Sequence, residues 1–161
     1  MTRSFIALLA IGIASGCSTG PDFPPLPAEM LAAYCVRGEA QIHQTKIGSI
    51  TSGDCNVGFS FREVWRVRVA SPTSVTFDAN SSFDNYLEVF RLDSYTATSA
   101  RLTWIGSNGD RWPGNLNALV TVTLQPNTDY FVRISGLDYA DTGPYSLAIA
   151  ACAGDPQPVS C

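Results

Sequence analysis

Apolar and polar side chains alternate in short runs along most of the chain after its first 35 residues, and this period of two is typical of half-buried β-strands. In one run, Trp65, Val67 and Val69 alternate with Arg66 and Arg68. We expect the apolar side chains of this strand to face a core and its guanidinium groups to face water. No segment sustains the 3.6-residue period of an amphipathic helix. The pattern therefore predicts an all-β domain.

Several other runs either show the same alternation or are apolar on both faces. They span residues 42–50, 75–79, 86–92, 102–105, 119–124, 130–134 and 145–149. Pro126 and Asn127 predict a tight turn, so we expect residues 119–124 and 130–134 to pair as a hairpin. Eight or nine strands separated by turn residues predict an antiparallel β-sandwich of the jelly-roll type, with a closed barrel as the alternative.

The first residues show a different pattern. Arg3 precedes a nine-residue apolar stretch, 5–13, which is far shorter than the roughly 20 residues that span a bilayer as a helix. Small residues at 14–16 lead into Cys17, and this arrangement resembles a bacterial lipobox, in which the cysteine receives a diacylglyceryl group and the chain is cut before it. We therefore expect an exported protein anchored through Cys17, with a plain signal peptide as the alternative. Ser18 resembles the outer-membrane sorting rule of lipoproteins, which predicts an outer-membrane location in the cell envelope.

Prolines dominate residues 18–27, where they prevent strand pairing and favour an extended, solvated tether. We expect residues 28–33 to form one or two helical turns. The chain thus divides into a signal peptide at 1–16, a lipidated cysteine with its tether at 17–34, and a single domain at 35–161. The 145 residues that follow the signal are enough for one hydrophobic core.

Four cysteines remain once Cys17 is set aside, and an even number in an exported protein indicates two disulfides. The order along the chain favours Cys35 with Cys55 and Cys152 with Cys161. Crossed pairings stay open. A zinc site is the rival interpretation, but the cysteines are widely spaced and the chain has a single histidine.

The charge of the mature chain narrows the class of partner. Without Arg3, nine Lys and Arg stand against fourteen Asp and Glu, a net charge of −5. No basic cluster is present that would meet a phosphate backbone. We therefore expect no nucleic acid partner.

Short stretches across residues 47–149 resemble the bacterial pre-peptidase C-terminal domain, a small β-sandwich found in many exported proteins. The most specific stretch is 82–89, which looks like the family's Phe-Asp-x-Tyr-Leu motif. The others are residues 48–55, 63–67, 107–110, 130–134 and 142–147. The resemblance implies an accessory domain that acts in secretion, in keeping a proenzyme competent, or in binding polymeric substrates, and it implies no protease activity for the domain itself.

Calcium is the one cofactor that the sequence suggests. Asp84 before a strand, and Asn108 with Asp110 in a Gly-containing turn, offer the hard oxygen ligands that Ca²⁺ prefers. The alternative is that these short polar side chains only stabilise turns by binding their own backbone. The same two interpretations apply to Asp138 and Asp141.

Exposed indole rings are candidates for ligand contact, because sugars stack on them. Trp112, in the 109–114 loop, is the first candidate, with loop packing against Pro113 as the alternative. Trp104 is the second candidate. Trp65 is in phase with the apolar residues of its strand and is expected in the core.

Catalytic chemistry finds little support in the chain. His43 has no nucleophile motif beside it, so we expect a surface histidine. The carboxylates that could act on glycosidic bonds are Glu63, Asp84, Glu88 and Asp110. We expect a non-catalytic envelope module, binding or structural, whose partner is a polysaccharide or a protein. The alternatives are an unrecognised secreted hydrolase and an accessory subunit of a separately encoded exported peptidase.

Overall fold

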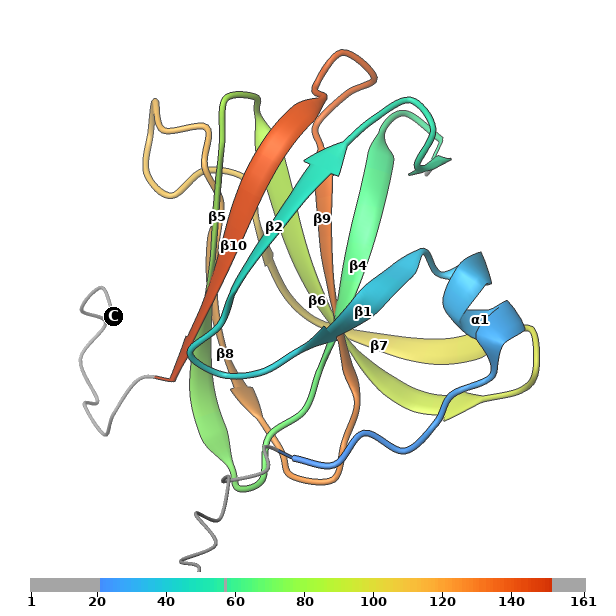
Figure 1. Ribbon diagram of the computed structural model, residues 1–161. Helices are drawn as coiled ribbons and strands as arrows, with labels where there is room; N and C mark the ends of the chain where they lie inside the picture. The colour runs from blue at the N-terminus through green and yellow to red at the C-terminus, as the bar shows by residue number, and fades with distance from the viewer. Residues whose placement is uncertain (1–20, 57, 152–161) are drawn as a thin grey trace, which may run out of the picture.

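The computed structural model describes residues 21–56 and 58–151, which form two β-sheets packed face to face (Figure 1). The signal peptide, Cys17, Cys152 and Cys161 lie outside these residues. The elements in chain order are α1 (Ala28–Ala33), β1 (Val36–Ala40), β2 (Thr45–Ile50), β3 (Cys55–Asn56), β4 (Phe61–Val67), β5 (Thr73–Ser81), β6 (Asn85–Tyr95), β7 (Ala100–Asn108), β8 (Leu119–Leu124), β9 (Tyr130–Gly136) and β10 (Gly143–Ala151).

One sheet, here called sheet A, has the strand order β1-β4-β9-β6-β7, and β3 pairs with β4 outside that path. The other, sheet B, has the order β2-β10-β5-β8. All pairs are antiparallel except β1 with β4. The predicted all-β sandwich is confirmed, with ten strands rather than eight or nine. The short strands β1 and β3 carry too few alternating residues to be recognised in the sequence.

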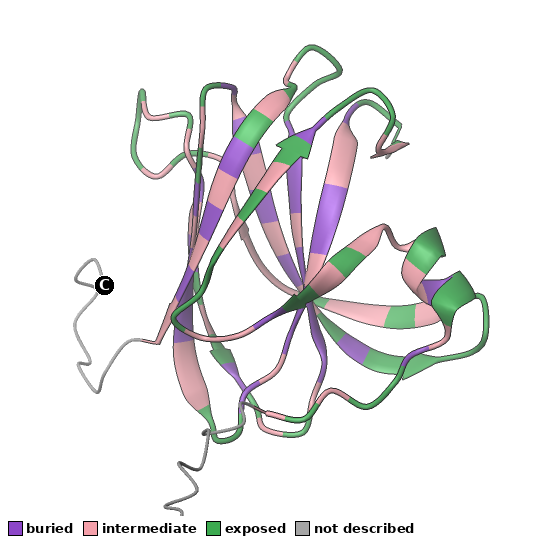
Figure 2. Cartoon of the chain, viewed as in Figure 1, coloured by how far each residue is buried: buried purple, intermediate pink, exposed green. Residues whose placement is uncertain are grey.

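The core lies between the sheets, and burial alternates along their strands (Figure 2). Phe77 and Leu147 of sheet B face Leu87 and Val132 of sheet A, and all four are completely buried. Full burial of such a side chain contributes about 1.5–3 kcal/mol. Because side chains alternate along each strand, the residues between these core positions project from the outer face of each sheet.

The predicted hairpin between β8 and β9 is wrong. The turn itself is present, with Asn127 at φ 57°, but β8 pairs with β5 in sheet B whereas β9 pairs with β4 and β6 in sheet A. The turn therefore crosses between the layers. The burial patterns explain this, because β9 is covered on both faces as a central strand while β8 has one exposed face.

Helix α1, predicted correctly, covers part of the outer face of sheet A. It buries Met30 completely against Val64 and Phe131, and Leu26 joins the same cluster. The end of the predicted tether, at Leu26, therefore packs against the domain, whereas Asp22, Pro24 and Pro25 are exposed. Among the residues that the structure describes, no helix is long and apolar enough to cross a membrane.

The same contacts correct the prediction that the β4 guanidinium groups face water. Arg66 is only 2% exposed. Its Nε donates to Asp129 at 2.8 Å and its Nη2 donates to the carbonyl of Pro24 at 2.7 Å. Arg68 also donates to a carbonyl of this segment, that of Asp22. The segment before α1 supplies acceptors that the strand pattern alone does not reveal.

Candidate functional site

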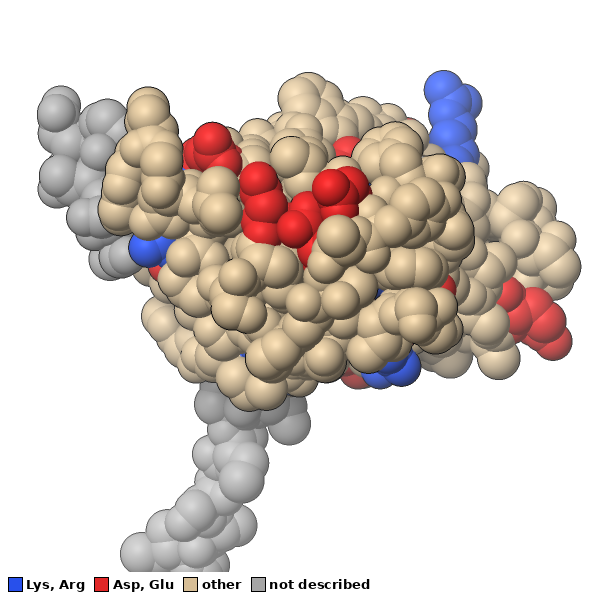
Figure 3. Space-filling model, turned by 90° about the horizontal axis from the view of Figure 1, so that it is seen from above, with Lys and Arg blue, Asp and Glu red and all other residues tan. Residues whose placement is uncertain are grey.

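The carboxylates proposed from the sequence as metal ligands meet at one end of the sandwich. This end is formed by the loops that follow β5, β7 and β9, and Figure 3 shows acidic side chains gathered on it. Burial raises the pKa of Asp84, and the nearby charges of Asp110, Asp141 and Asp138 raise it further. The fold thus brings together Asp84 and Asp110, as the metal prediction requires.

Other side chains of this end are engaged in local hydrogen bonds. Asn108 donates its Nδ2 to the carbonyl of Leu119 at 3.0 Å. Asp138 accepts from the backbone N–H of Ala140, and Asp141 accepts from that of Asp138, as expected of turn-stabilising residues. Across residues 21–56 and 58–151, no three His, Cys, Asp or Glu side chains are grouped so that they could hold a metal. Calcium binding by Asp84, Asn108 and Asp110 stays a prediction.

Both tryptophans proposed as ligand contacts are exposed, Trp104 by 56% and Trp112 by 55%. Trp112 lies in the loop after β7, with the guanidinium of Arg111 5.6 Å from its ring centre. Trp104 is the cross-strand partner of Phe90 on the edge strand β7. Trp65 is partly buried against the core and donates its Nε1 to the hydroxyl of Tyr145 at 2.9 Å.

The carboxylates proposed for glycosidic chemistry lie in three separate places. Glu63 is buried inside the sandwich, where it accepts from the hydroxyl of Tyr145 at 2.5 Å and from Nε of Arg37 at 2.7 Å. Burial and this hydrogen bond raise the pKa of Tyr145. Glu88 lies on the outer face of sheet A, whereas Asp84 and Asp110 lie at the loop end. His43 is exposed, as predicted.

The strongest candidate site lies on the outer face of sheet A, where the register aligns polar residues from three central strands. Arg62 on β4 pairs with Ser135 on β9, which pairs with Tyr86 on β6. In the next row, Arg133 on β9 pairs with Glu88 on β6. Side chains two residues apart share a face of a sheet, so both rows project away from the core.

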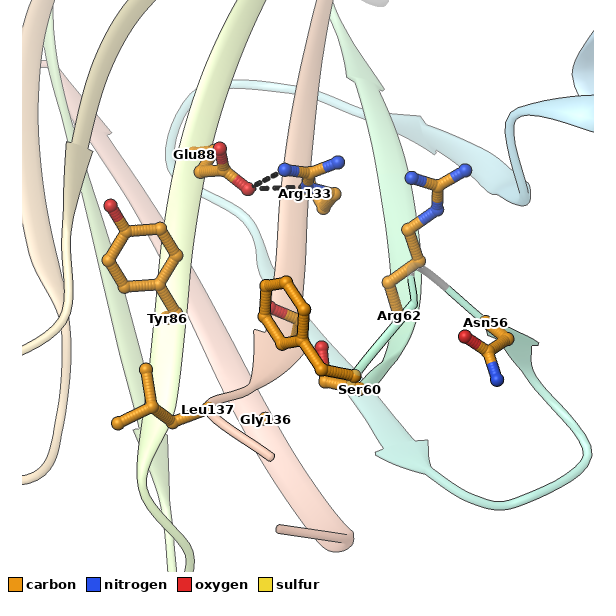
Figure 4. Close-up of a pocket in the computed structure, with 10 residues that line it drawn as sticks. Asn56, Ser60, Arg62, Tyr86, Glu88, Arg133, Gly136 and Leu137 are labelled. Carbon is orange, nitrogen blue, oxygen red and sulfur yellow. Dashed lines mark hydrogen bonds and ion pairs between the residues drawn. The ribbon is translucent and has the colours of Figure 1, made fainter. Parts of the chain in front are cut away.

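These rows form the floor of a cavity of ≈ 720 Å³ that is open to solvent. Figure 4 shows Arg62 and Arg133 toward one end of it, with Tyr86 and Leu137 toward the other. The lining residues come from β3, β4, β6, β9 and the segments beside them: Asn56, Phe59, Ser60, Arg62, Tyr86, Glu88, Arg133, Ser135, Gly136 and Leu137. We call this cavity the outer-face groove.

Arg133 and Glu88 neutralise each other within the groove. Nε of Arg133 donates to Oε2 of Glu88 at 2.5 Å, and its Nη2 donates to the same oxygen. The guanidinium also lies 5.0 Å from the ring centre of Phe90, a distance at which a cation is attracted to an aromatic face. This pair fixes the middle of the groove floor.

Arg62 has no such partner. Its Nε is buried without an acceptor, and none of the ion pairs among the described residues includes its guanidinium. Burial lowers the pKa of Arg62, and the nearby charge of Arg133 lowers it further. Ser60, which is 1% exposed and also lines the groove, has a hydroxyl without a partner in the described chain. The groove therefore contains two buried polar groups that the described residues leave unsatisfied.

A second, smaller cavity of ≈ 100 Å³ adjoins the outer-face groove and shares Arg62 and Arg133 with it. Its other lining residues are apolar or aromatic: Tyr34, Val64, Phe90, Leu102 and Phe131. We call it the apolar annex. The two guanidinium groups thus stand between the wide groove and an apolar recess.

The rim of the outer-face groove is apolar and is braced by long-range contacts. Phe59 and Leu137 are 65% and 52% exposed. The hydroxyl of Tyr139 donates to the carbonyl of Gly58 at 2.6 Å, which ties the loop after β9 to the loop before β4. The disulfide Cys35–Cys55 confirms one predicted pairing, and it anchors β3 next to this rim.

Sequence reasoning missed Arg62 as a candidate. The strand pattern places Arg66 and Arg68 on the face away from the core, and the same alternation places Arg62 of β4 there. The pattern cannot reveal which of these arginines has an acceptor, because acceptors come from distant parts of the chain. Those of Arg66 lie 42 and 63 positions away, and Arg62 has none among the described residues. The feature of the sequence that could have indicated Arg62 is the spacing of Arg62, Arg66 and Arg68, which places all three on one face.

No family model and no curated protein sequence matches the chain, but solved structures share its fold. The pre-peptidase C-terminal domain of a collagenase from Bacillus anthracis is 16% identical, with a TM-score of 0.51 over 70% of this chain and 92% of that one. CorA, a surface-associated copper-binding protein of Methylomicrobium album BG8, is 10% identical, with a TM-score of 0.52 over 73% and 99% of the two chains. PliG, a periplasmic inhibitor of g-type lysozyme from Aeromonas hydrophila, is 15% identical, with a TM-score of 0.48 over 73% and 99%. The first of these has the fold that the sequence resemblance implied.

Proposed function

We propose that this chain is an exported binding module, anchored to the cell envelope through lipid on Cys17, which binds a partner in the outer-face groove. The observation that supports the binding role most directly is Arg62, a guanidinium without an acceptor in an open cavity. A buried donor without a partner costs stability. A ligand that supplies the acceptor would remove that cost.

The size and composition of the groove support a binding role. Its ≈ 720 Å³ lies within the roughly 300–1,000 Å³ of ligand pockets, which are mostly apolar with a few placed polar groups. The groove has an apolar rim at Phe59 and Leu137 and charged groups on its floor. In the part of the chain that the structure describes, no histidine lines the groove beside the hydroxyls of Ser60 and Ser135, so these hydroxyls lack an imidazole base that would activate them.

One of the fold neighbours supports an envelope location. The copper-binding neighbour is described as surface-associated. Residues 14–17 support the anchor, because small residues precede the cysteine. Replacing Cys17 with Ser should move the protein from the membrane fraction to the soluble fraction of the producing cells. Retention of Cys17→Ser in the membrane fraction would contradict the anchor and would leave the groove proposal unaffected.

Photo-crosslinking in cells tests the groove. A photoreactive amino acid at Leu137, on the groove rim, should capture a partner, and the same amino acid at Ile47, which is 72% exposed on sheet B, should not. Adding Arg62→Gln should remove the Leu137 crosslinks. Equal crosslinks at both positions, or crosslinks at Leu137 that persist in Arg62→Gln, would contradict a groove-specific partner.

A polysaccharide partner is the second candidate, favoured by the exposure of Trp104 beside Phe90 on the outer face of sheet A. An indole ring presents an apolar face on which a sugar ring can stack. If this candidate is correct, Trp104→Ala should abolish retention on a polysaccharide matrix while Trp112→Ala keeps it. Normal retention of both variants on the matrix would rule out this candidate.

A further inference from the structure

The charges in the outer-face groove differ in sign from the charge of the protein. The groove contains Arg62, Arg133 and Glu88 as its charged lining residues, which gives one net positive charge. The whole chain has a net charge of −4. A surplus cation at the floor of a cavity in an acidic protein selects for an anionic group on a ligand.

The surplus charge is localised on Arg62. Glu88 is engaged by two nitrogens of Arg133. Its charge acts on Arg62 only from a distance and does not offset burial and the charge of Arg133, so Arg62 has no hydrogen-bonded carboxylate among the described residues. The lowered pKa of Arg62 has burial as its first cause and the charge of Arg133 as its second. A carboxylate placed here would oppose both effects, because an opposite charge favours the charged form of the guanidinium.

The neighbouring hydroxyl strengthens this assignment. Ser60 is almost fully buried, lines the same cavity as Arg62, and has no hydrogen-bond partner among residues 21–56 and 58–151. A hydroxyl can donate to a carboxylate oxygen. A planar carboxylate is also the group that matches the forked donors of a guanidinium.

The surroundings of Arg62 indicate that the acid belongs to a peptide with apolar neighbours. On one side lies the rim of Phe59 and Leu137, and on the other lies the apolar annex with Phe90 and Leu102. The rim residues and most of the annex are hydrocarbon, which suits apolar side chains better than the hydroxyl groups of a sugar acid. Apolar side chains on either side of one Asp or Glu would fill both flanks.

Resting on the proposed binding role, we infer that the outer-face groove recognises an acidic peptide segment. The carboxylate of an Asp or Glu pairs with Arg62, and flanking apolar side chains occupy the groove rim and the apolar annex. The partner is thus a protein with an exposed acidic-apolar segment. Arg133 engages Glu88, so Glu88 does not act as an internal hydrogen-bond acceptor for Arg62.

Selection from a library of random displayed peptides tests the inference, with the full chain as its bacterial host processes it. Selected peptides should contain Asp or Glu next to apolar residues. Changing that acid to its amide, or changing the protein by Arg62→Gln, should weaken binding at least about tenfold, as expected for a lost charge-assisted hydrogen bond. Arg62→Lys should recover part of the affinity, because it keeps the charge and loses the planar fork.

Arg101→Gln is the matched control, since Arg101 is an exposed cation on β7 outside the groove, and it should bind selected peptides as the wild type does. Peptides that bind Arg62→Gln as tightly as the wild type, or that lack acidic residues, would overturn the inference. A second probe, polygalacturonate, separates the two proposals. Binding of this acidic polysaccharide that depends on Arg62, without any such peptide, would overturn the peptide inference and leave the groove proposal standing. No Arg62-dependent binding of either probe, together with no Leu137 crosslinks, would overturn both.

Discussion

Arg66 and Arg62 lie four residues apart on β4 and project from the same face of sheet A, but their surroundings differ. Arg66 is almost fully buried and donates to Asp129, to Glu39 and to the carbonyl of Pro24. Arg62 donates to no described residue and faces an open cavity. One half of this face is therefore closed by the chain itself, and the other half has the same kind of side chain and no internal acceptor.

The difference separates a structural part of the outer face of sheet A from a part that is open to a ligand. Residues 22–26 and α1 cover the half around Arg66 and satisfy its guanidinium, so that side chain is structural. No described element covers the half around Arg62. An uncompensated cation costs stability, and residues that cost stability concentrate at functional sites.

Breaking the covered half should have the largest effect. Arg66→Gln leaves Asp129, which is 9% exposed, without its main cation, and removal of one partner from a buried pair costs about 3–5 kcal/mol. Urea unfolding measures the change. Arg101→Gln, the exposed control, should stay within about 0.5 kcal/mol of the wild type. A loss below about 1 kcal/mol for Arg66→Gln would show that its contacts are not structural.

Removing the disulfide beside the groove rim should have the next largest effect on stability. The Cys35–Cys55 disulfide closes a sequence separation of 20 residues, and replacing both cysteines with Ser should cost about 2–4 kcal/mol. Because β3 lies against the groove rim, peptide binding should weaken as well. Normal peptide affinity in the folded double variant would show that the disulfide does not shape the groove.

The sequence supplied most of the fold and little of this comparison. Alternation along 65–69 correctly indicates a strand and its core face, because that pattern follows from local geometry, although the strand itself spans Phe61–Val67. It failed for Arg66 because its acceptors, Asp129 and Pro24, come from distant parts of the chain. The turn at Asn127 was likewise recognised, but local residues do not determine whether the next strand joins the same sheet.

The candidate metal ligands illustrate the same limit. Asp84 and Asp110 were predicted to converge, and the fold brings their charges close enough to raise the pKa of Asp84. Asn108 was placed in the same set, but its amide donates to the carbonyl of Leu119 on β8. Asn108 is on β7 of sheet A and Leu119 is on β8 of sheet B, so the contact depends on how the two sheets pack together, which no local pattern encodes.

Glu88→Gln should change stability and peptide binding in opposite directions. It removes the carboxylate that neutralises Arg133, so stability should fall by about 1–2 kcal/mol. Two unpaired guanidinium groups would then line the groove, so acidic peptides should bind more tightly. Thermal unfolding and peptide titration of the same variant measure both. Weaker binding of acidic peptides by Glu88→Gln would argue against charge as the basis of recognition.

Asp84→Asn, at the loop end, should have the smallest effect. Folding raises the pKa of Asp84, so the folded state binds more protons than the unfolded state just above the ordinary carboxyl pKa of about 4, and stability falls as the pH rises through that range. The Asn variant should therefore be slightly more stable at neutral pH, by well under about 1 kcal/mol because the charge is largely solvated, and equal to the wild type in strong acid. If calcium binds, added calcium should stabilise the wild type and not the variant. A neutral-pH loss in chelator would show that Asp84 acts only as a turn former.

Urea unfolding of Arg62→Gln, with acidic-peptide binding followed on the same preparation, tests the central claim most directly. The account predicts a free energy of unfolding equal to or above that of the wild type, by up to about 1 kcal/mol because a partly buried cation without a partner is removed, together with loss of peptide binding. A marked loss of stability, or full stability with unchanged peptide binding, would contradict the claim that Arg62 is held open for a ligand.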